Sequence, residues 1–258
     1  MNRILKTSSI VFLTIFILTL TINKTQLINI EEFYSDFYVI WYALLSNTVI
    51  FLKISVGDLI YILFPLFIII YFFKIERRRD RFYFIIKIPI IVYCLFYWSW
   101  GFNYNKKSEF ELLKTNEYSI EDLYSTTEHY IKKTNDLQMK ISKSKEKKAE
   151  SNLMFTDIKN ECIKSIKKSD WIFEKSKINS FPVKKSIFST PLSYMGFSGY
   201  INPFTLEANI NYNIPDISIP VTISHEIAHQ IGYAFEDEAN YIAIETLSKS
   251  ENNYLRYS

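Results

Sequence analysis

Three long apolar runs without a charged residue constrain this chain more than any other feature. They extend from Thr7 to Ile22, from Leu59 to Phe73 and from Ile88 to Phe102. Each is shorter than the ~20 residues that cross the hydrocarbon core of a bilayer, but the flanking residues supply the missing length. Arginines clustered outside the runs favour membrane helices over buried helices of a soluble core. The sequence therefore predicts three membrane spans, near residues 7–22, 59–73 and 83–102.

Basic residues near the ends of these runs predict the orientation of the chain. Arg3 and Lys6 precede the first run, and Lys74 with the four arginines of residues 77–81 separates the second run from the third. Short loops rich in Lys and Arg remain on the cytoplasmic side of a membrane. Everything after Phe102 is therefore expected to be extracytoplasmic.

A further apolar stretch at residues 37–52 does not fit this scheme as a span. A span there would place the arginine-rich loop outside or invert the N-terminus, against the charge rule. Ser46-Asn47-Thr48 interrupts its centre, which favours an amphipathic helix on the outer membrane surface. The first run could alternatively be a signal peptide. No small-residue cleavage site follows Ile22, so an uncleaved anchor is preferred.

The rest of the chain predicts a separate polar domain at residues 105–258, after a membrane region at residues 1–104. Ser119 with an acidic residue three positions later indicates a helix start, and a helical pattern recurs at residues 155–166. Prolines, glycines and alternating residues between 181 and 220 predict short strands and loops. An extended segment there would either pair with the backbone of a peptide substrate or serve only as a scaffold strand.

The pentapeptide His225-Glu226-Ile227-Ala228-His229 is the strongest indication of function. On a helix, positions i and i+4 share one face, so both imidazoles can reach one tetrahedral zinc ion. Glu226, beside the first histidine, would act as the general base. The apolar run from Val221 to Ile231 predicts the helix, and Gly232 its end. The chain has only three histidines, so a chance match is improbable, and His129 in a polar stretch is expected to be solvated.

A third metal ligand is expected shortly after this helix. Gly232 lets the chain turn back, as in metzincin proteases, but the third-ligand position of that class falls on Phe235, which cannot bind zinc. Glu236 and Glu238 are the available substitutes, and both could alternatively form the acidic first turn of another helix. Glu236 is favoured because Asn240, one turn later, could hold a ligand in place. Glu238 is expected to face the helix surface or to cap the helix.

Several motifs together resemble a known family. They are Ser55-Val56-Gly57-Asp58, Pro203-Phe204-Thr205-Leu206-Glu207-Ala208-Asn209-Ile210-Asn211, His225-Glu226-Ile227-Ala228-His229-Gln230 and Glu236-Asp237-Glu238-Ala239-Asn240-Tyr241. They are similar to the bacterial family catalogued as domain of unknown function 3810, over nearly the whole chain. The resemblance implies a multi-span membrane protein with a zincin-like domain, presumed to be a zinc metallopeptidase, and it implies no substrate. This chain ends at Ser258, where members of the family continue with further helix, so a shortened catalytic domain is expected.

The expected fold class is an α-helical transmembrane region followed by an extracytoplasmic α+β zincin-like domain. The expected function is a zinc metallopeptidase of the HExxH type, anchored in the bacterial cytoplasmic membrane and acting at its outer face. One Zn2+ would be held by His225, His229 and Glu236, with Glu226 as the base. The expected partners are the lipid bilayer and a polypeptide substrate close to the membrane or in the envelope. A non-catalytic zinc-binding envelope or sensor protein, and a membrane scaffold without metal, are the alternatives.

Composition and cysteine placement exclude other classes. The net charge of +3 is spread along lysine-rich helices, which gives no case for nucleic-acid binding. Cys94 lies in an apolar run and Cys162 in the polar region, so neither a disulfide nor cysteine zinc ligands are expected. An intramembrane protease is disfavoured, because Glu226 and the acidic residues 236–238 could not lie in a span that faces lipid.

Overall fold

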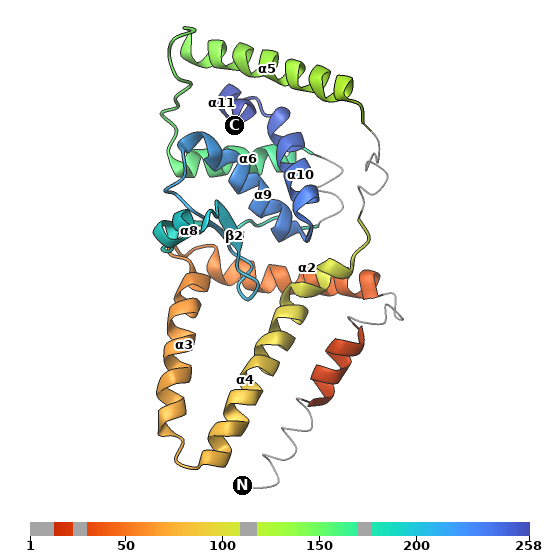
Figure 1. Ribbon diagram of the computed structural model, residues 1–258, viewed down its shortest axis with the longest axis vertical. Coiled ribbons are helices and arrows are strands. Elements are labelled where there is room, and N and C mark those ends of the chain that lie inside the picture. The colour runs from red at the N-terminus through yellow and green to blue at the C-terminus, as the bar shows by residue number, and fades with distance from the viewer. Residues whose placement is uncertain (1–12, 23–29, 109–117, 170–176) are drawn as a thin grey trace. The chain divides into compact units, whose positions relative to one another are not determined.

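The computed structural model describes residues 13–22, 30–108, 118–169 and 177–258 (Figure 1). The chain divides into two compact units. Unit 1 comprises Met1–Lys107 together with the short segment Asn202–Glu207, and unit 2 comprises Ser108–Ile201 and Ala208–Ser258. The protein is mostly helical, with one small mixed sheet in unit 2.

Unit 1 is built from helices. In chain order they are the helix Leu13–Ile22, α2 (Ile30–Val49), α3 (Val56–Lys74), α4 (Arg78–Ser99) and the 3-10 helix η1 (Gly101–Asn105). Helix α3 begins where the hydroxyl of Ser55 accepts a hydrogen bond from the backbone N–H of Asp58 at 3.0 Å. The turn into α4 is held by Arg81, whose Nε donates to the carbonyl of Ile75 at 2.6 Å.

Helices α3 and α4 are long and apolar enough to cross a membrane, and few of their residues are buried. Helix α3 covers the span predicted at 59–73, whereas α4 begins before the span predicted at 83–102 and ends at Ser99, ahead of η1. Side chains such as Leu63 and Phe67 are more than half exposed, which suits a lipid environment better than water. Residues 7–12 of the first predicted span lie outside the described residues. Leu13–Ile22 forms an apolar helix that alone is shorter than a bilayer, so the third span remains a prediction.

Helix α2 extends over Ile30–Val49, earlier than the predicted amphipathic segment at 37–52. One face is buried through Tyr34, Tyr38 and Tyr42, spaced four residues apart, whereas Ile40 and Leu44 are exposed.

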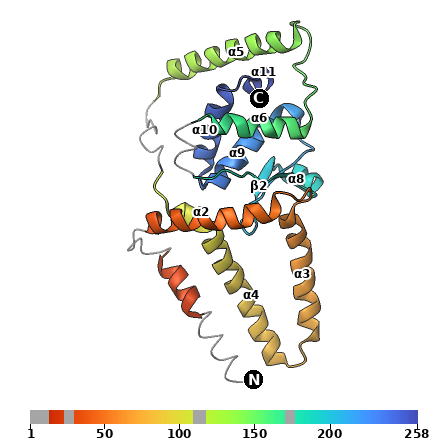
Figure 2. The same ribbon diagram turned by 180° about the vertical axis from the view of Figure 1, so that it is seen from behind.

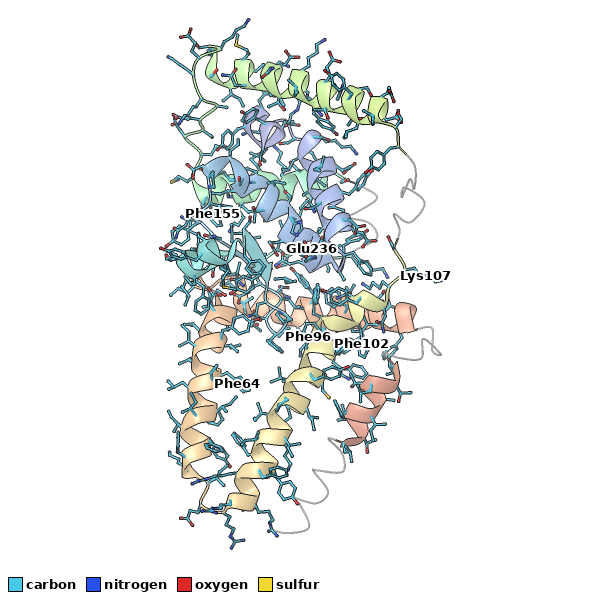
Figure 3. All side chains as sticks on the ribbon, in the orientation of Figure 1. Phe64, Phe96, Phe102, Lys107, Phe155 and Glu236 are labelled. Atoms are coloured by element: carbon cyan, nitrogen blue, oxygen red, sulfur yellow. The ribbon has the colours of Figure 1, made fainter. Side chains whose placement is uncertain are left out.

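An aromatic cluster joins α2, α4 and η1 within unit 1. The ring of Phe102 lies 5.4 Å from the rings of both Tyr34 and Trp98, measured between centroids. Phe96 and Phe102, both labelled in Figure 3, take part in it. Packed rings of this kind stabilise the end of α4 against α2.

Unit 2 contains the sheet and the remaining helices. They are α5 (Ile120–Ser142), α6 (Phe155–Lys167), β1 (Val183–Lys185), α8 (Ser189–Met195), β2 (Gly199–Ile201), β3 (Ala208–Ile210), η3 (Asp216–Ser218), α9 (Ile219–Ile231), α10 (Glu236–Ser248) and α11 (Asn253–Tyr257). The strand order is β1-β3-β2, with β1 parallel and β2 antiparallel to β3. In register, Val183 is opposite Ala208 and Gly199 is opposite Ile210.

Local sequence signals identify most elements of unit 2. Ser119 caps α5 in a capping box with Asp122, and α6 covers the pattern predicted at 155–166. Within residues 181–220, predicted as short strands and loops, the structure also contains helix α8. Gly196, with φ of 78°, ends α8 in the left-handed conformation that glycine adopts without strain.

Helix α9 lies at the centre of unit 2. It packs against α6, α10, β2 and β3, and it lies beside α10 in both views (Figure 1 and Figure 2). Ile223, Ile227 and Ala228 are completely buried. A helix packed on several sides holds its side chains in defined positions, which suits a helix that carries a site.

Candidate metal centre

The helix that carries the pentapeptide has clear sequence-encoded ends. Pro220 lies in its first turn, where the missing N–H costs nothing. Gly232 ends it with φ of 101°, and the N–H of Tyr233 donates to the carbonyl of Ala228 at 3.1 Å. The predicted helix and stop are therefore confirmed. The reversed chain begins α10 at Glu236, only a few residues later.

The two histidines and Glu236 form one cluster. The Nε2 atoms of His225 and His229 are 3.1 Å apart. The Glu236 carboxylate lies 3.1 Å from Nε2 of His225 through Oε2 and 3.6 Å from Nε2 of His229 through Oε1. One ligand atom from each residue lies within 4.8 Å of the others, a group that could hold a metal ion. Glu236, labelled in Figure 3, is 77% exposed, so the cluster opens toward solvent.

Each imidazole has a hydrogen-bond partner on the side that faces away from the cluster. Nδ1 of His225 lies 2.9 Å from Oδ1 of Asn240, and Nδ1 of His229 lies 2.7 Å from the carbonyl oxygen of Tyr233. Both partners are oxygen acceptors, which favours the proton on Nδ1 and leaves Nε2 as the atom that can bind a metal. Asn240 thus holds a ring, as the sequence predicted. Burial lowers the pKa of His229, which keeps this imidazole neutral and able to bind a metal.

Glu226 lies on the same helix but is deeply buried, with 4% of its surface exposed. Its Oε2 has no hydrogen-bond partner among the described residues. Burial raises the pKa of Glu226 well above its ordinary value, and the negative charge of Glu236 raises it further. A carboxylate of this kind is a stronger base than one in water.

Glu238 corrects one expectation. It was expected to face the helix surface or to cap the helix, but it is buried, with 4% exposed, and lies outside the metal-binding group. Helix α10 packs on α9, so its third residue, Glu238, points into the protein interior. Its first residue, Glu236, remains exposed to solvent. His129 is exposed on α5, as predicted.

Gly199 is a site residue that the sequence did not reveal. It lies in β2, and a Cβ atom built on it would be 2.9 Å from Oε1 of Glu226 and 3.0 Å from Cγ2 of Thr222. Strand β2 therefore passes directly against the Glu226 carboxylate. The sequence predicted an extended segment here but contained no signal for this close approach.

Comparison with known proteins identifies a family whose function is unknown. The family model described as "Protein of unknown function (DUF3810)" matches residues 33–258. No curated protein and no solved structure matches the chain. The match confirms the family that the motifs resemble, and the chemistry has to be inferred from the site itself.

Proposed function

The chain belongs to the DUF3810 family of proteins of unknown function, and we propose that it is a zinc metallopeptidase. The observation that supports this most is the cluster of His225, His229 and Glu236 beside the buried carboxylate of Glu226. Two imidazoles and one carboxylate are the ligand set of catalytic zinc in one class of peptidases, where a fourth position is left for water or substrate.

The donor set fits zinc. Both Nε2 atoms carry lone pairs on one side of the cluster, and Asn240 and the carbonyl of Tyr233 hold the rings from the other side. Such partners keep ring orientation and basicity constant when a metal binds. A zinc ion held there would supply a Lewis acid that lowers the pKa of a water molecule to about 7 and polarises the scissile carbonyl.

Glu226 would move the protons of the reaction. Its unpartnered Oε2 would accept a proton from the attacking water and then donate it to the leaving amine. Burial and the charge of Glu236 raise the pKa of Glu226, which makes its carboxylate a stronger base for the first of these steps.

Strand β2 would align the substrate. It is an edge strand of the sheet formed by the described strands, and it passes beside Glu226. A peptide in extended conformation can add to such an edge through backbone hydrogen bonds. This supports the substrate-binding interpretation of the segment over the scaffold interpretation.

Helices α3 and α4 would anchor the enzyme in the membrane. The arginines between them would remain cytoplasmic, and unit 2 would then lie outside the cytoplasm. Natural substrates would then be polypeptides of the cell envelope or close to the membrane.

The test compares the wild-type protein with Glu226→Gln, both purified as the full chain in detergent. Zinc content is measured by mass spectrometry and hydrolysis with a library of fluorogenic peptides. The wild type should cleave part of the library with one zinc per chain, and Glu226→Gln should keep the zinc but lose cleavage. Equal cleavage by both proteins would refute the mechanism. Zinc in both without any cleavage would favour the non-catalytic zinc-binding protein.

A further inference from the structure

Two motifs separated by about 150 residues meet inside unit 1, and the proposed reaction uses neither. One is Ser55-Val56-Gly57-Asp58 at the start of α3, and the other is the segment Asn202–Glu207. The carboxylate of Glu207 accepts hydrogen bonds from the N–H of Gly57 at 2.7 Å and from the N–H of Val56 at 3.2 Å. Glu207 is completely buried.

This contact satisfies the N-terminus of α3. The first N–H groups of a helix have no partner within the helix, and the positive end of the helix dipole attracts an anion. Hydroxyl groups complete the arrangement: Thr205 donates to Oε2 of Glu207 at 2.9 Å, and the Ser55 hydroxyl lies 3.4 Å from the same atom. A buried carboxylate with this many donors is firmly held.

The segment itself has a closed conformation that packs on Gly57. The N–H of Asn202 donates to the carbonyl of Glu207 at 2.9 Å, and the N–H of Leu206 donates to the carbonyl of Asn202 at 2.8 Å. A Cβ atom on Gly57 would lie 2.6 Å from Cγ of Asn202, so only glycine permits this approach. Leu206, with φ of 57°, adopts the left-handed conformation that residues with a Cβ avoid, which shows how strongly the surroundings determine the segment.

Chain connectivity leads from this segment to the candidate site. Asn202 directly follows β2 (Gly199–Ile201), and Glu207 directly precedes β3 (Ala208–Ile210). Gly199 of β2 lies against the Glu226 carboxylate. The segment that contacts the start of α3 is therefore continuous in the chain with both strands, one of which passes the Glu226 carboxylate.

We propose that Glu207 is a positioning residue that fastens the turn between β2 and β3 to the first turn of α3 and thereby holds strand β2 in register beside Glu226. For its effect on hydrolysis this inference rests on the proposed function. Its structural part concerns only the mobility of residues 199–211 and can be measured without any activity.

The test uses hydrogen–deuterium exchange on the full chain in detergent, with Glu207→Gln and Gly57→Ala as separate variants. The first removes the charge without changing the shape, and the second places a methyl group against Asn202. Peptides covering residues 199–211 should exchange about tenfold faster in both variants, with zinc content unchanged and peptides of α6 and α9 as in the wild type. Glu251→Gln, at an exposed position of unit 2, is the matched control and should change nothing in residues 199–211.

A double variant tests whether both changes break the same contact between residues 202–207 and the first turn of α3. The exchange rate of residues 199–211 in Glu207→Gln/Gly57→Ala should not exceed that of the more strongly affected single variant, because the second change finds the contact already broken. Hydrolysis should show a lower kcat, by about 10- to 100-fold, with little change in KM.

Two results would overturn the proposal. One is wild-type exchange of residues 199–211 in both single variants. The other is equal acceleration throughout unit 2, which would make Glu207 a contributor to general stability. Failure of the proposed function would be recognised by a different result. Glu226→Gln would still hydrolyse peptides, whereas the exchange rates of residues 199–211 would change as proposed.

Discussion

Two buried glutamates, Glu226 in unit 2 and Glu207 in unit 1, show how surroundings decide what a carboxylate does. Glu207 is completely buried, and two backbone N–H groups and the hydroxyl of Thr205 donate to its oxygens. Glu226 is equally inaccessible, but its Oε2 has no hydrogen-bond partner among the described residues. Burial with donors stabilises the fold, whereas burial without them costs stability and leaves a reactive group.

Removing the charge of Glu226 should have the largest effect on activity. Glu226→Gln should lower hydrolysis by about 10²–10⁴-fold, as expected for loss of a general base, while bound zinc is retained. The free energy of unfolding should not fall, because no hydrogen bond to Oε2 is lost. Peptide hydrolysis, zinc analysis and chemical unfolding measure the three quantities. A large loss of stability would contradict the contrast with Glu207.

Substitutions in and around the cluster should weaken zinc binding to different degrees. His229→Ala and Glu236→Gln should weaken binding most, because the first removes a ligand atom and the second replaces a charged carboxylate ligand with a neutral amide. Asn240→Ala should weaken it by about 10–100-fold through loss of the hydrogen bond to His225. Glu238→Gln should weaken it least. Zinc titration against a competing chelator decides the order, and zinc lost in Glu238→Gln but kept in Glu236→Gln would contradict the assignment.

Removing the charge of Glu207 should affect stability instead. Glu207→Gln should lower the free energy of unfolding by about 1.5–3 kcal/mol, because charge-assisted bonds to the N–H groups of Val56 and Gly57 are weakened. Chemical unfolding in detergent provides the measurement. An unchanged free energy of unfolding would mean that the hydrogen bonds to the Glu207 carboxylate do not stabilise the fold, and the contrast with Glu226 would be wrong.

Thiol labelling on intact cells, in a Cys94→Ser background, tests whether unit 2 and the arginine-rich start of α4 lie on opposite sides of the membrane. Cysteine in place of Ser151 should react with an impermeant reagent, and cysteine in place of Asp80 should not. Cys162 is an internal control, because burial raises its pKa to about 12 and the thiol stays protonated and unreactive. The opposite labelling pattern would reverse the orientation.

Much of the candidate site could be predicted from nearby residues. His225 and His229 share a face because a helix repeats every 3.6 residues, and Gly232 allows the turn that brings Glu236 back within a few residues. Asn240 could be placed by the same spacing. Glu238 could not, because which side of α10 packs against α9 depends on contacts between helices rather than on position within one helix.

The sequence by itself determined the apolar helices α3 and α4, the helix α9 with its glycine stop, and the pairing of two histidines on one helix face, and it favoured Glu236 over Glu238 as the third ligand. These depend on local propensities and on residues at most a few turns apart. Only the tertiary structure decided that β2 passes Glu226 at Gly199 and that Glu207 caps a helix about 150 residues earlier in the chain. The physical reason is that such pairings arise from close packing of distant segments, which no local periodicity encodes.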